Sequence, residues 1–409
     1  MAHVLFLTQV LPYPLDAGPK IRAYYVLRYL AQQHEVTLVS FVREEDRPEW
    51  VAHLASFCQS VHTVPMQRSR WQDARALAKA AVLGVPVIIV RDEIAAMYAT
   101  LRELVQSRAF DVIHADQTSM AQYAQFARQW ALRRRPDVPV GLVLDAHNAL
   151  FRVFRQLAKD EPNKLKRLFL AREAHALERY ERHTYAQFDH VVFVTEQDRI
   201  SLGEAGSARS GRTTTIPICI DLAERSRIAP QAEQRLVTHL GTMFWPPNVE
   251  GVLWFARHVF PRVLAQVPDA RLVIIGKRPP AEVQALDGSG GVQVLGYVSD
   301  PEPYLAETGA FIVPLHAGAG MRVKILDGWG WGLPIVSTTL GAEGIDAHHG
   351  EDLLIADDAE AYAEAVIRLL MDPALRVRLG ERGRRRAMED YNWRVIYPKW
   401  DEVYRSVLE

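Results

Sequence analysis

The stretch that most constrains this chain runs from residue 310 to residue 344, AFIVPLHAGAGMRVKILDGWGWGLPIVSTTLGAEG. An apolar run over residues 311–315 leads into a small-residue loop over 317–320, and a helical pattern opens near Met321. A strand that passes through a glycine loop into a helix leaves backbone N–H groups free at the helix N-terminus. Together with the helix dipole, these groups attract an anion such as a phosphate. The stretch therefore predicts a phosphate-binding turn.

Two cations, Arg322 and Lys324, stand in the expected first turn of this helix. Cations oppose the helix dipole there, where Asp or Glu would be the better structural choice. Their placement favours an anionic ligand that offsets this cost. Asp327 follows Lys324 by three residues, so both side chains can share one helix face. The alternative is a plain loop and a surface helix with an i,i+3 ion pair.

These residues also resemble a known family. The run GAGMRVKILDGWGWGLPIVST, with AEG just after it, is similar to the donor-site segment of GT-B glycosyltransferases of family four. Members typically carry G-x-G-x-R-x-K-x-L-E-A-x-A-x-G-x-P-V-V there. The nearest subgroup is the bacterial sugar transferases of polysaccharide-assembly systems. The resemblance covers the whole chain, is most specific in residues 310–345, and is weak before residue 215.

The resemblance implies transfer of a sugar from a nucleotide sugar, with retention of anomeric configuration and with neither a metal ion nor a cofactor. It assigns Arg322, Lys324 and the backbone of residues 318–320 to the leaving diphosphate, and Asp327 to the ribose hydroxyls. The full set of donor-binding residues is Gly18, Lys20, Gly241, Thr242, Lys277, Gly318, Ala319, Gly320 and Asp327. Two family glutamates are absent, because Asp327 replaces the second and Ala319 the first of the E-x7-E pattern.

The first half of the chain alternates strands and helices as a doubly wound parallel sheet does. Largely apolar runs lie at residues 3–8, 36–42, 62–65, 111–114, 141–145 and 190–194, with helices between them. The loop after the first run holds Gly18 and Lys20, and Arg22 follows them. Ligands of such sheets bind beyond the strand C-termini, so these residues are expected to face a ligand. A tight turn with solvated Lys and Arg is the alternative.

Polar residues end two of these strands, at the rim where such sheets are active. His114 and Asp116 end one strand, and His147 follows the next. The family carries H-x-H at the first of these ends and a histidine at the position of His147. We expect His147 and His114 on the acceptor side, with Asp116 as the alternative to His147 in positioning. The expected catalytic set is then Arg322, Lys324, His147 and Asp116, although a lone strand-end histidine is more often a packing residue.

A second alternation of strands and helices begins at residue 236. Its apolar runs lie at residues 236–242, 271–276, 292–298, 310–315, 334–338 and 352–355. Most relatives place an Arg and a Lys in the loop after the first run, but GTMFWPPN has neither, so Arg322 and Lys324 are expected to supply that charge. Asn248 is expected to cap the next helix. Lys277 ends a neighbouring strand, where the family binds the nucleotide base; a solvated charge is the alternative.

Residues 151–187 are expected to form one long or bent helical region that is rich in Lys and Arg. Glutamates are interleaved with these basic residues, so the plain interpretation is a solvated, ion-paired face. The alternative is a basic surface that lies against anionic membrane lipid, near a lipid-linked acceptor.

A chain of 409 residues is too long for one compact core and favours two domains. We place a first, acceptor-side Rossmann-like domain at residues 1–222, with a helix at 392–409 that crosses back onto it, and a nucleotide-sugar-binding domain at 235–391. The composition is 49% hydrophobic and 24% charged, as in ordinary globular proteins. A net charge of −1 gives no general attraction to nucleic acid.

The expected location is cytoplasmic, at most peripheral at the inner face of the membrane. The chain holds only two cysteines, Cys58 and Cys219, which favours a reducing compartment. Its first residues lack the basic region of a signal peptide, and it contains no run of 18 apolar residues.

The sequence therefore predicts a GT-B fold of two doubly wound Rossmann-like α/β domains that face each other across a cleft. The expected function is a retaining hexosyltransferase that uses a nucleoside diphosphate sugar and a hydroxyl acceptor, either a glycan or a lipid-linked molecule. Two alternatives stay open. One is a GT-B phosphorylase or sugar-nucleotide epimerase, and the other is a non-catalytic partner subunit that binds a nucleotide sugar.

Overall fold

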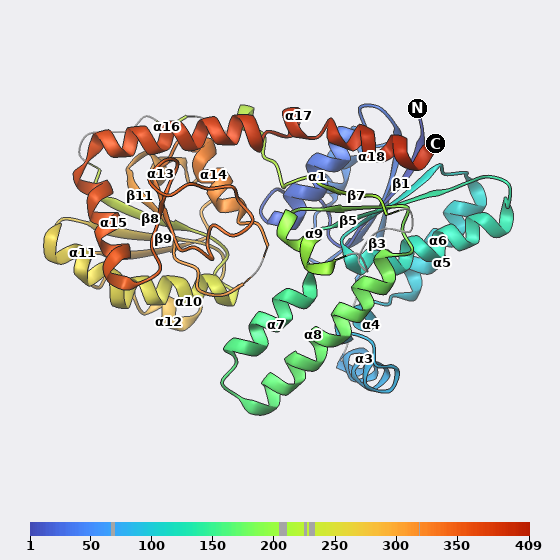
Figure 1. The fold of residues 1–409 in the computed structure, drawn as a ribbon, viewed down its shortest axis with the longest axis horizontal. Helices are drawn as coiled ribbons and strands as arrows, with labels where there is room; N and C mark the ends of the chain where they lie inside the picture. The colour runs from blue at the N-terminus through green and yellow to red at the C-terminus, as the bar shows by residue number, and fades with distance from the viewer. Residues whose placement is uncertain (67–69, 204–210, 225–226, 229–233, 319) are drawn as a thin grey trace. The chain divides into compact units, whose positions relative to one another are not determined.

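The chain divides into two compact units, each with its own parallel sheet. Unit 1 comprises Met1–Cys219 together with Ile396–Glu409, and unit 2 comprises Ile220–Val395. The computed structural model describes residues 1–66, 70–203, 211–224, 227–228, 234–318 and 320–409 (Figure 1). Strand–helix alternation thus predicted the fold class correctly, since both units are doubly wound α/β structures.

Unit 1 is built on a seven-stranded sheet in the order β3-β2-β1-β4-β5-β6-β7, and all neighbours pair in parallel. The strands are β1 (His3–Thr8), β2 (Glu35–Val42), β3 (Ser60–Pro65), β4 (Val112–Asp116), β5 (Gly141–Ala146), β6 (His190–Phe193) and β7 (Thr213–Thr215). Every residue of β4, β5 and β6 is buried, which explains their largely apolar sequences. The strand order reverses between β1 and β4, so ligands are expected beyond the carboxyl ends of these strands.

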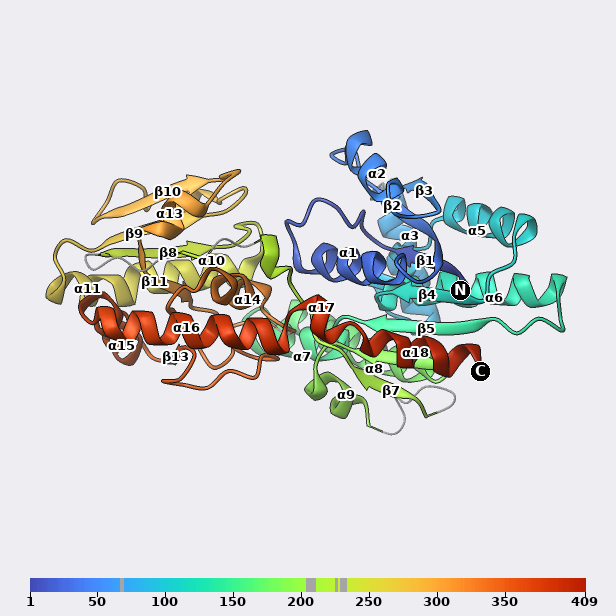
Figure 2. The same ribbon diagram turned by 90° about the horizontal axis from the view of Figure 1, so that it is seen from above.

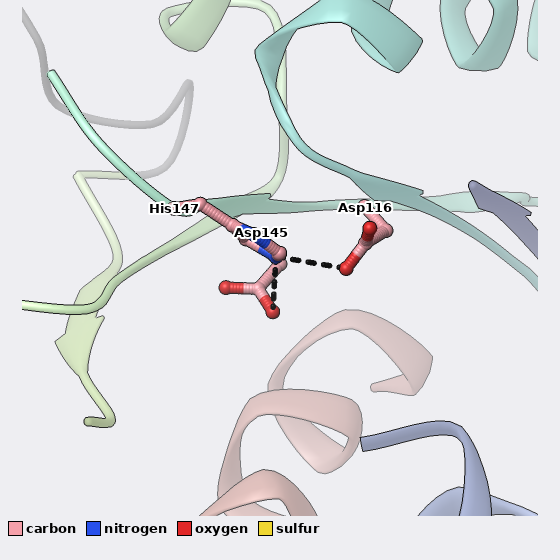
Figure 3. A group of neighbouring side chains, drawn as sticks. All are labelled: Asp116, Asp145 and His147. Atoms are coloured by element: carbon pink, nitrogen blue, oxygen red, sulfur yellow. Dashed lines mark hydrogen bonds and ion pairs between the residues drawn. The ribbon is translucent and has the colours of Figure 1, made fainter. Parts of the chain in front are cut away.

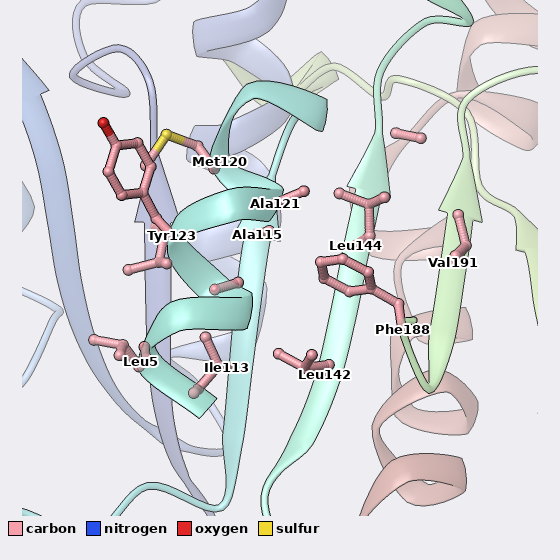
Figure 4. Close-up of a cluster of buried hydrophobic side chains, with 14 of the residues drawn as sticks. Leu5, Ile113, Ala115, Met120, Ala121, Tyr123, Leu142, Leu144, Phe188 and Val191 are labelled. Atoms are coloured by element: carbon pink, nitrogen blue, oxygen red, sulfur yellow. The ribbon is translucent and has the colours of Figure 1, made fainter. Parts of the chain in front are cut away.

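One face of this sheet carries the main core of unit 1. Leu5 and Ile113 point from the strands toward Met120 and Tyr123, and Phe188 closes the core beyond Leu142 and Leu144 (Figure 4). The helices of unit 1 in the described ranges are α1 (Gly18–Leu30), α2 (Pro48–Ala55), α3 (Arg70–Leu83), α4 (Val87–Arg91), α5 (Ala95–Ser107), η1 (Thr118–Met120), α6 (Ala121–Arg134), α7 (Leu150–Asp160), α8 (Lys164–Tyr185), α9 (Glu196–Leu202) and α18 (Lys399–Leu408).

The opposite face of the sheet receives the last helix of the chain, α18, which contacts β5 (Figure 2). Successive strand residues point to opposite faces, so Phe6 and His114 face away from the core that holds Leu5. Phe6 stacks on His114 with ring centroids 4.3 Å apart. Trp400 and Tyr404 of α18 are fully buried, as expected of packing residues.

The segment expected to be one long or bent helical region forms two separate helices, α7 and α8, packed side by side as a hairpin (Figure 1). Pro162 follows α7, and a residue that precedes a proline is pushed out of the helical region. Asn163 then caps α8, because its Oδ1 accepts hydrogen bonds from the backbone N–H groups of Leu165 (3.0 Å) and Lys166 (3.1 Å).

Unit 2 is built on a six-stranded parallel sheet in the order β10-β9-β8-β11-β12-β13. The strands are β8 (Leu236–Leu240), β9 (Arg271–Ile275), β10 (Val292–Gly296), β11 (Thr308–Val313), β12 (Ile335–Ser337) and β13 (Leu354–Ile355). The remaining described elements are η3 (Leu222–Glu224), α10 (Pro246–Trp254), the π-helical turn η4 (Phe255–Val259), α11 (Phe260–Gln266), α12 (Ala281–Gln284), α13 (Glu302–Ala306), α14 (Val323–Trp331), α15 (Ala359–Met371), α16 (Pro373–Asp390) and α17 (Trp393–Ile396).

None of the helices in the described ranges is both long enough and apolar enough to span a membrane.

Candidate active site

The predicted phosphate turn of unit 2 joins β11 to α14. Gly318 and Gly320 adopt φ angles of 106° and 85°, a region that favours glycine, so the turn requires glycine at both positions. Ala319 lies outside the described residues. The helix begins at Val323, and Arg322 is its N-cap residue, so one of the two cations precedes the first turn and Lys324 lies in it.

Arg322 is folded back over this turn. Its Nη1 donates a hydrogen bond to the backbone carbonyl of Gly320 at 2.7 Å. A Cβ atom added to Gly318 would lie 3.1 Å from Nη2, so the guanidinium lies directly against the glycine backbone. Burial lowers the pKa of Arg322, since desolvation disfavours its charged form.

Lys324 reaches from α14 to the end of β8. Its Nζ donates to Asn248 Oδ1 at 2.9 Å, and Asn248 Nδ2 donates to the carbonyl of Thr242 at 2.8 Å. A Cβ atom on Gly241 would lie 2.6 Å from Nζ, so glycine at position 241 lets the lysine approach the backbone here. Burial, together with the neighbouring charge of Arg322, lowers the pKa of Lys324 to about 7.

This arrangement corrects the role expected for Asn248. The N-cap of α10 is Trp245, and the helix begins at Pro246, two residues before Asn248. The Asn248 side chain instead links Lys324 to the β8 loop. The loop GTMFWPPN lacks a cation of its own, and the amide of Asn248 fixes the lysine that comes from α14.

Two further predicted donor-side residues lie near other loops of unit 2. Asp327 is on α14, one turn beyond Lys324, and is partly exposed. Lys277 follows β9, and its Nζ stands 4.6 Å from the centre of the Tyr297 ring, in the loop after β10. Lys277 therefore contacts an exposed aromatic ring at the carboxyl edge of the sheet.

The strand ends of unit 1 bring Asp116, Asp145 and His147 together (Figure 3). Asp116 and Asp145 are register partners at the ends of β4 and β5. His147 Nε2 lies 2.8 Å from Asp116 Oδ1 and 3.7 Å from Asp145 Oδ2. The structure thus joins the predicted pair His147 and Asp116, and adds Asp145.

Arg22 balances the charge of this cluster from α1. Its Nε and Nη2 donate to the two carboxylate oxygens of Asp145 at 2.8 and 2.9 Å, and Nη1 donates to the carbonyl of Pro217 at 2.5 Å. Arg22 and Asp145 are fully buried. The expectation that Arg22 faces a ligand is therefore wrong: it forms a buried bidentate ion pair.

The cluster shifts its own protonation equilibria. Burial raises the pKa of Asp145, but Arg22 outweighs burial and holds that pKa well below its usual range. Burial lowers the pKa of His147, but the carboxylates of Asp116 and Asp145 outweigh burial and raise it to about 9. Burial raises the pKa of Asp116. His147 is therefore a cation at neutral pH, and its proton lies toward Asp116.

The same three side chains could be considered as ligands of a metal ion, since their donor atoms lie within 4.8 Å of one another. Both oxygens of Asp145 already accept hydrogen bonds from Arg22, and His147 Nε2 is directed at Asp116. A bound cation would have to displace that proton beside an existing guanidinium. The geometry favours a proton-sharing network, and metal independence stays a prediction.

A hollow of about 70 Å³ opens beside His147, lined by Gln9, Ile88, Ile89, Gln117, Thr118, Ser119, Asn148 and Leu150. Within the described residues, His147 Nδ1, Gln117 Nε2 and Ser119 Oγ are buried and make no hydrogen bond. Buried polar atoms in proteins are usually satisfied. A ligand rich in hydroxyl groups would satisfy them here.

His114 does not reach this hollow. It is fully buried on the opposite face of the sheet, where its Nδ1 lies 2.9 Å from the hydroxyl of Tyr404. The predicted contact of His114 with an acceptor is therefore corrected to a packing role. Burial also lowers the pKa of His114 to about 3, so its ring is neutral.

Gly18 and Lys20 were expected in the loop before the first helix, but they lie in the helix itself. Both lie in the first turn of α1, which begins at Gly18 because Ala17 is extended and Pro19 is well suited to a first helical turn. Lys20 Nζ pairs with Asp16 Oδ1 at 3.1 Å. These two predicted donor-binding residues thus sit at a helix N-terminus of unit 1.

Comparison with known families covers most of both units. The model described as "Glycosyl transferase 4-like domain" matches residues 17–219, and the model described as "Glycosyl transferases group 1" matches residues 234–372. The chain belongs to family four of the GT-B glycosyltransferases. The activity expected from the donor-site segment is thereby confirmed at the level of the enzyme class.

Individual relatives match different shares of this glycosyltransferase. It is 24% identical over 387 residues, 90% of each chain, to an uncharacterized 44.6 kDa protein in the cps region of Klebsiella pneumoniae. It is 31% identical over 157 residues to the lipopolysaccharide core biosynthesis glycosyltransferase LpsE of Rhizobium meliloti, which is 36% of this chain and 46% of that protein.

Solved structures share the fold of this glycosyltransferase. Anabaena HepE in complex with UDP and glucose superposes with a TM-score of 0.68 at 15% identity, covering 99% of this chain and 100% of that one. WaaG, a glycosyltransferase involved in lipopolysaccharide biosynthesis, superposes with a TM-score of 0.66 at 15% identity, covering 98% and 99%.

Two site residues of this glycosyltransferase were missed from the sequence. No role is predicted for Asp145 from the sequence, although an aspartate within an otherwise apolar strand signals a buried partner. Asn248 was explained by capping, and nothing in the local sequence pairs it with a lysine 76 residues away.

Proposed function

We propose that this glycosyltransferase moves a hexose from a nucleoside diphosphate sugar to a hydroxyl of a glycan or lipid-linked acceptor, in the synthesis of a cell-surface polysaccharide or glycoconjugate. The named relative LpsE acts in lipopolysaccharide core biosynthesis, and the HepE structure holds UDP and glucose. These names support the substrate class by likeness. The donor-side residues of this chain support the same substrate class by their own geometry.

The observation that carries the proposal is the pair of cations at the start of α14. Arg322 and Lys324 are drawn against glycine backbone by Gly320 and Asn248, and their pKa values are lowered by burial. Two like charges held together in this way destabilise the empty site. A diphosphate between them and the helix N-terminus would relieve the repulsion.

These groups would then act on the bond that breaks. As the glycosidic C–O bond of the donor lengthens, negative charge develops on the leaving diphosphate. Preorganised cations and backbone N–H groups stabilise that charge more than the ground state, which is commonly the largest contribution to catalysis. We assign Arg322, Lys324 and the backbone of the glycine turn to this role.

The unit 1 cluster is assigned to positioning. In a retaining reaction the leaving phosphate can take the proton of the acceptor hydroxyl, so no side-chain base is required. His147 is protonated at neutral pH because its pKa lies near 9, and it is therefore unsuited to accept that proton. Its Nδ1 lines the hollow with Gln117 and Ser119 and would hold an acceptor or sugar hydroxyl.

The remaining donor contacts complete the proposal. Asp327 would bind the ribose hydroxyls, and the Lys277–Tyr297 pair would lie along the nucleotide base. Gly18, Lys20, Gly241 and Thr242 would approach the phosphates and sugar through backbone or charge. Since Arg322 and Lys324 supply the positive charge, we propose that the reaction proceeds without a metal ion.

Donor binding tests the proposal directly. A thermal-shift screen against UDP, GDP, ADP, dTDP and CMP, with and without Mg²⁺, should give a selective rise with one diphosphate that is independent of Mg²⁺. A nucleotide at 100-fold its Kd stabilises the native protein by about 2.7 kcal/mol. A flat response to all five nucleotides would contradict the donor site.

Turnover of the identified donor sugar tests the role of the lysine. Lys324→Ala should lower turnover by about 10²- to 10³-fold, as for loss of one group that stabilises a developing anion. Arg271→Ala is the control, because Arg271 is a 60% exposed cation of unit 2 paired with Glu307 on the surface. Near-normal turnover in Lys324→Ala would overturn the assignment.

A further inference from the structure

Large apolar side chains are exposed on two elements of unit 1, α3 and the first turns of α8. Trp71 is 87% exposed and Leu165 is 81% exposed. The others on these elements are Leu77, Val82, Leu83, Leu168 and Phe169. Several large exposed apolar side chains on neighbouring elements mark an interaction site more often than singly scattered ones do.

The tip of the α7–α8 hairpin is largely open to solvent. All residues from 162 to 169 are exposed, and Leu165, Leu168 and Phe169 keep 81%, 69% and 41% of their surface open to solvent. The helix is nevertheless well formed there, because Asn163 caps it. Leu165, Leu168 and Phe169 are not part of the main core of unit 1, and Leu165 and Leu168 are left mostly exposed.

Positive charge surrounds these apolar groups. Residues 159–172 contain five basic and two acidic residues, a net charge of +3 (5 − 2), whereas the whole chain carries −1. Lys166 is paired with Glu161. Among the described side chains, Lys164 and Arg167 form no ion pair, and both are exposed.

α3 is tied to the same hairpin. Arg172 Nη2 of α8 donates to the carbonyl of Ala80 in α3 at 2.5 Å, and Glu173 accepts a hydrogen bond from the backbone of Val87 just beyond it at 2.8 Å. Figure 1 shows α3 and the hairpin extending from the same side of unit 1. The segments that lead from them, α4 and the start of α7, contribute Ile89 and Leu150 to the wall of the His147 hollow.

We propose that α3 and the tip of α8 form a membrane-docking surface for an anionic lipid bilayer. The apolar side chains, led by Trp71, Leu165 and Leu168, enter the interface between head groups and acyl chains. Lys164 and Arg167 contact the anionic head groups. A second copy of the chain fits this surface poorly, because two tips of net charge +3 would repel each other.

Such docking goes beyond sugar transfer and does not require it, but it gives the proposed lipid-linked acceptor a physical basis. A bilayer that holds the hairpin tip lies at the far end of α8 from the hollow. Residues 164–181 of α8 span about 25 Å at 1.5 Å per residue, and Glu181 accepts the backbone hydrogen bond of Leu150 at the hollow.

Co-sedimentation of the full chain with vesicles tests the surface. Vesicles of phosphatidylcholine that contain about 30% phosphatidylglycerol should carry the protein into the pellet. Vesicles of pure phosphatidylcholine should carry much less of the protein into the pellet. Removing both charges in Lys164→Ala/Arg167→Ala should weaken binding by about 25-fold, since each basic residue near such a surface contributes about fivefold. Leu165→Ser/Leu168→Ser should weaken binding to both vesicle types.

The matched control is Ile200→Ser, because Ile200 is a 64% exposed apolar residue of unit 1 on α9. Equal binding of wild type to both vesicle compositions, or unchanged binding of the Leu165→Ser/Leu168→Ser variant, would overturn the proposal. A dimer in solution that this variant converts to a monomer would also overturn it, in favour of a second copy. Thermal shift with nucleotide in the same variants should be unchanged, which separates docking from the donor site.

Discussion

Arg22 and Asp145 form a bidentate ion pair inside unit 1. Both side chains are fully buried, so each would be an unpaired charge without the other. Removing one partner of a buried pair typically costs about 3–5 kcal/mol. We expect Asp145→Asn to lower the free energy of unfolding of unit 1 by that order, measured by urea denaturation.

Asp269→Asn is the control for this prediction. Asp269 is 72% exposed and lies 3.7 Å from Arg235, so its pair is screened by solvent. Exposed pairs contribute about 0–1 kcal/mol. If Asp145→Asn and Asp269→Asn lowered the free energy of unfolding equally little, the buried pair would not stabilise the contact between α1 and β5.

His147 makes the stability of unit 1 depend on pH. Its pKa is raised from 6.5 to about 9 in the folded protein. The stabilisation from its charge is therefore complete below pH 6.5 and is lost as the pH rises through 9. The stability difference between wild type and His147→Gln, measured by urea denaturation from pH 6 to 9.5, should shrink with rising pH; a constant difference would refute the charged state.

The affinity for the diphosphate should depend on pH, because the pKa of Lys324 is lowered into the neutral range. With a pKa of about 7 in the free enzyme, Lys324 is charged below that pH and largely neutral above it. A diphosphate binds the charged form better, so the affinity for UDP or the preferred diphosphate should fall from pH 6 to pH 8.5. Calorimetric titration should show this fall in wild type, and Lys324→Met should bind weakly with a flatter profile.

At the scale of elements, the close packing of α10 against the end of β11 depends on one glycine, Gly251. A Cβ atom on Gly251 would lie 2.3 Å from the carbonyl oxygen of Pro314, at the end of β11. Replacing a mid-helix glycine by alanine gains at most about 1 kcal/mol of helix propensity. The clash is with backbone, and overpacking costs about 1–3 kcal/mol, so the net effect should be destabilising.

Urea denaturation of Gly251→Ala checks this prediction, with Glu250→Ala as the control. Glu250 is the preceding residue on the same helix and is exposed, so its replacement by alanine brings no clash with β11 and should change stability little. A Gly251→Ala variant as stable as wild type would show that α10 can shift away from β11.

Most of these elements could be predicted from the sequence, because a parallel sheet buried on both faces leaves long apolar runs such as β1 and β6. The break between α7 and α8 is not predicted, because the composition of residues 151–187 favours helix throughout. Pro162 and Asn163 are the local signals that could have indicated it. The strand-end pair His147 and Asp116 could be placed on one rim by topology. The partners Arg22 and Asn248 could not, since only tertiary packing brings α1 to β5 and α10 to α14.

At the scale of the whole molecule, α18 links the stability of unit 1 to the last residues of the chain. Trp400 is fully buried against unit 1 and lies near Arg22. Trp400→Ala should cost about 3–5 kcal/mol. Multi-domain chains need not unfold in one step, so we expect the transition of unit 1 to shift while that of unit 2 stays.

Differential scanning calorimetry resolves the two transitions. Trp245→Ala is the control, because Trp245 is 47% exposed and lies in unit 2. A shift of both transitions by the same amount in Trp400→Ala would mean that the two units unfold as one cooperative body.

The return of α18 to unit 1 also bears on how the chain is made. Residues Ile220–Val395 emerge from the ribosome before Ile396–Glu409, so unit 2 is complete while unit 1 still lacks its last helix. Domains generally fold as units during synthesis, the N-terminal one first. Here the last step departs from that order: the face of the first sheet that carries His114 stays uncovered until residues 396–409 have emerged, and transiently exposed apolar surface of this kind is prone to aggregation.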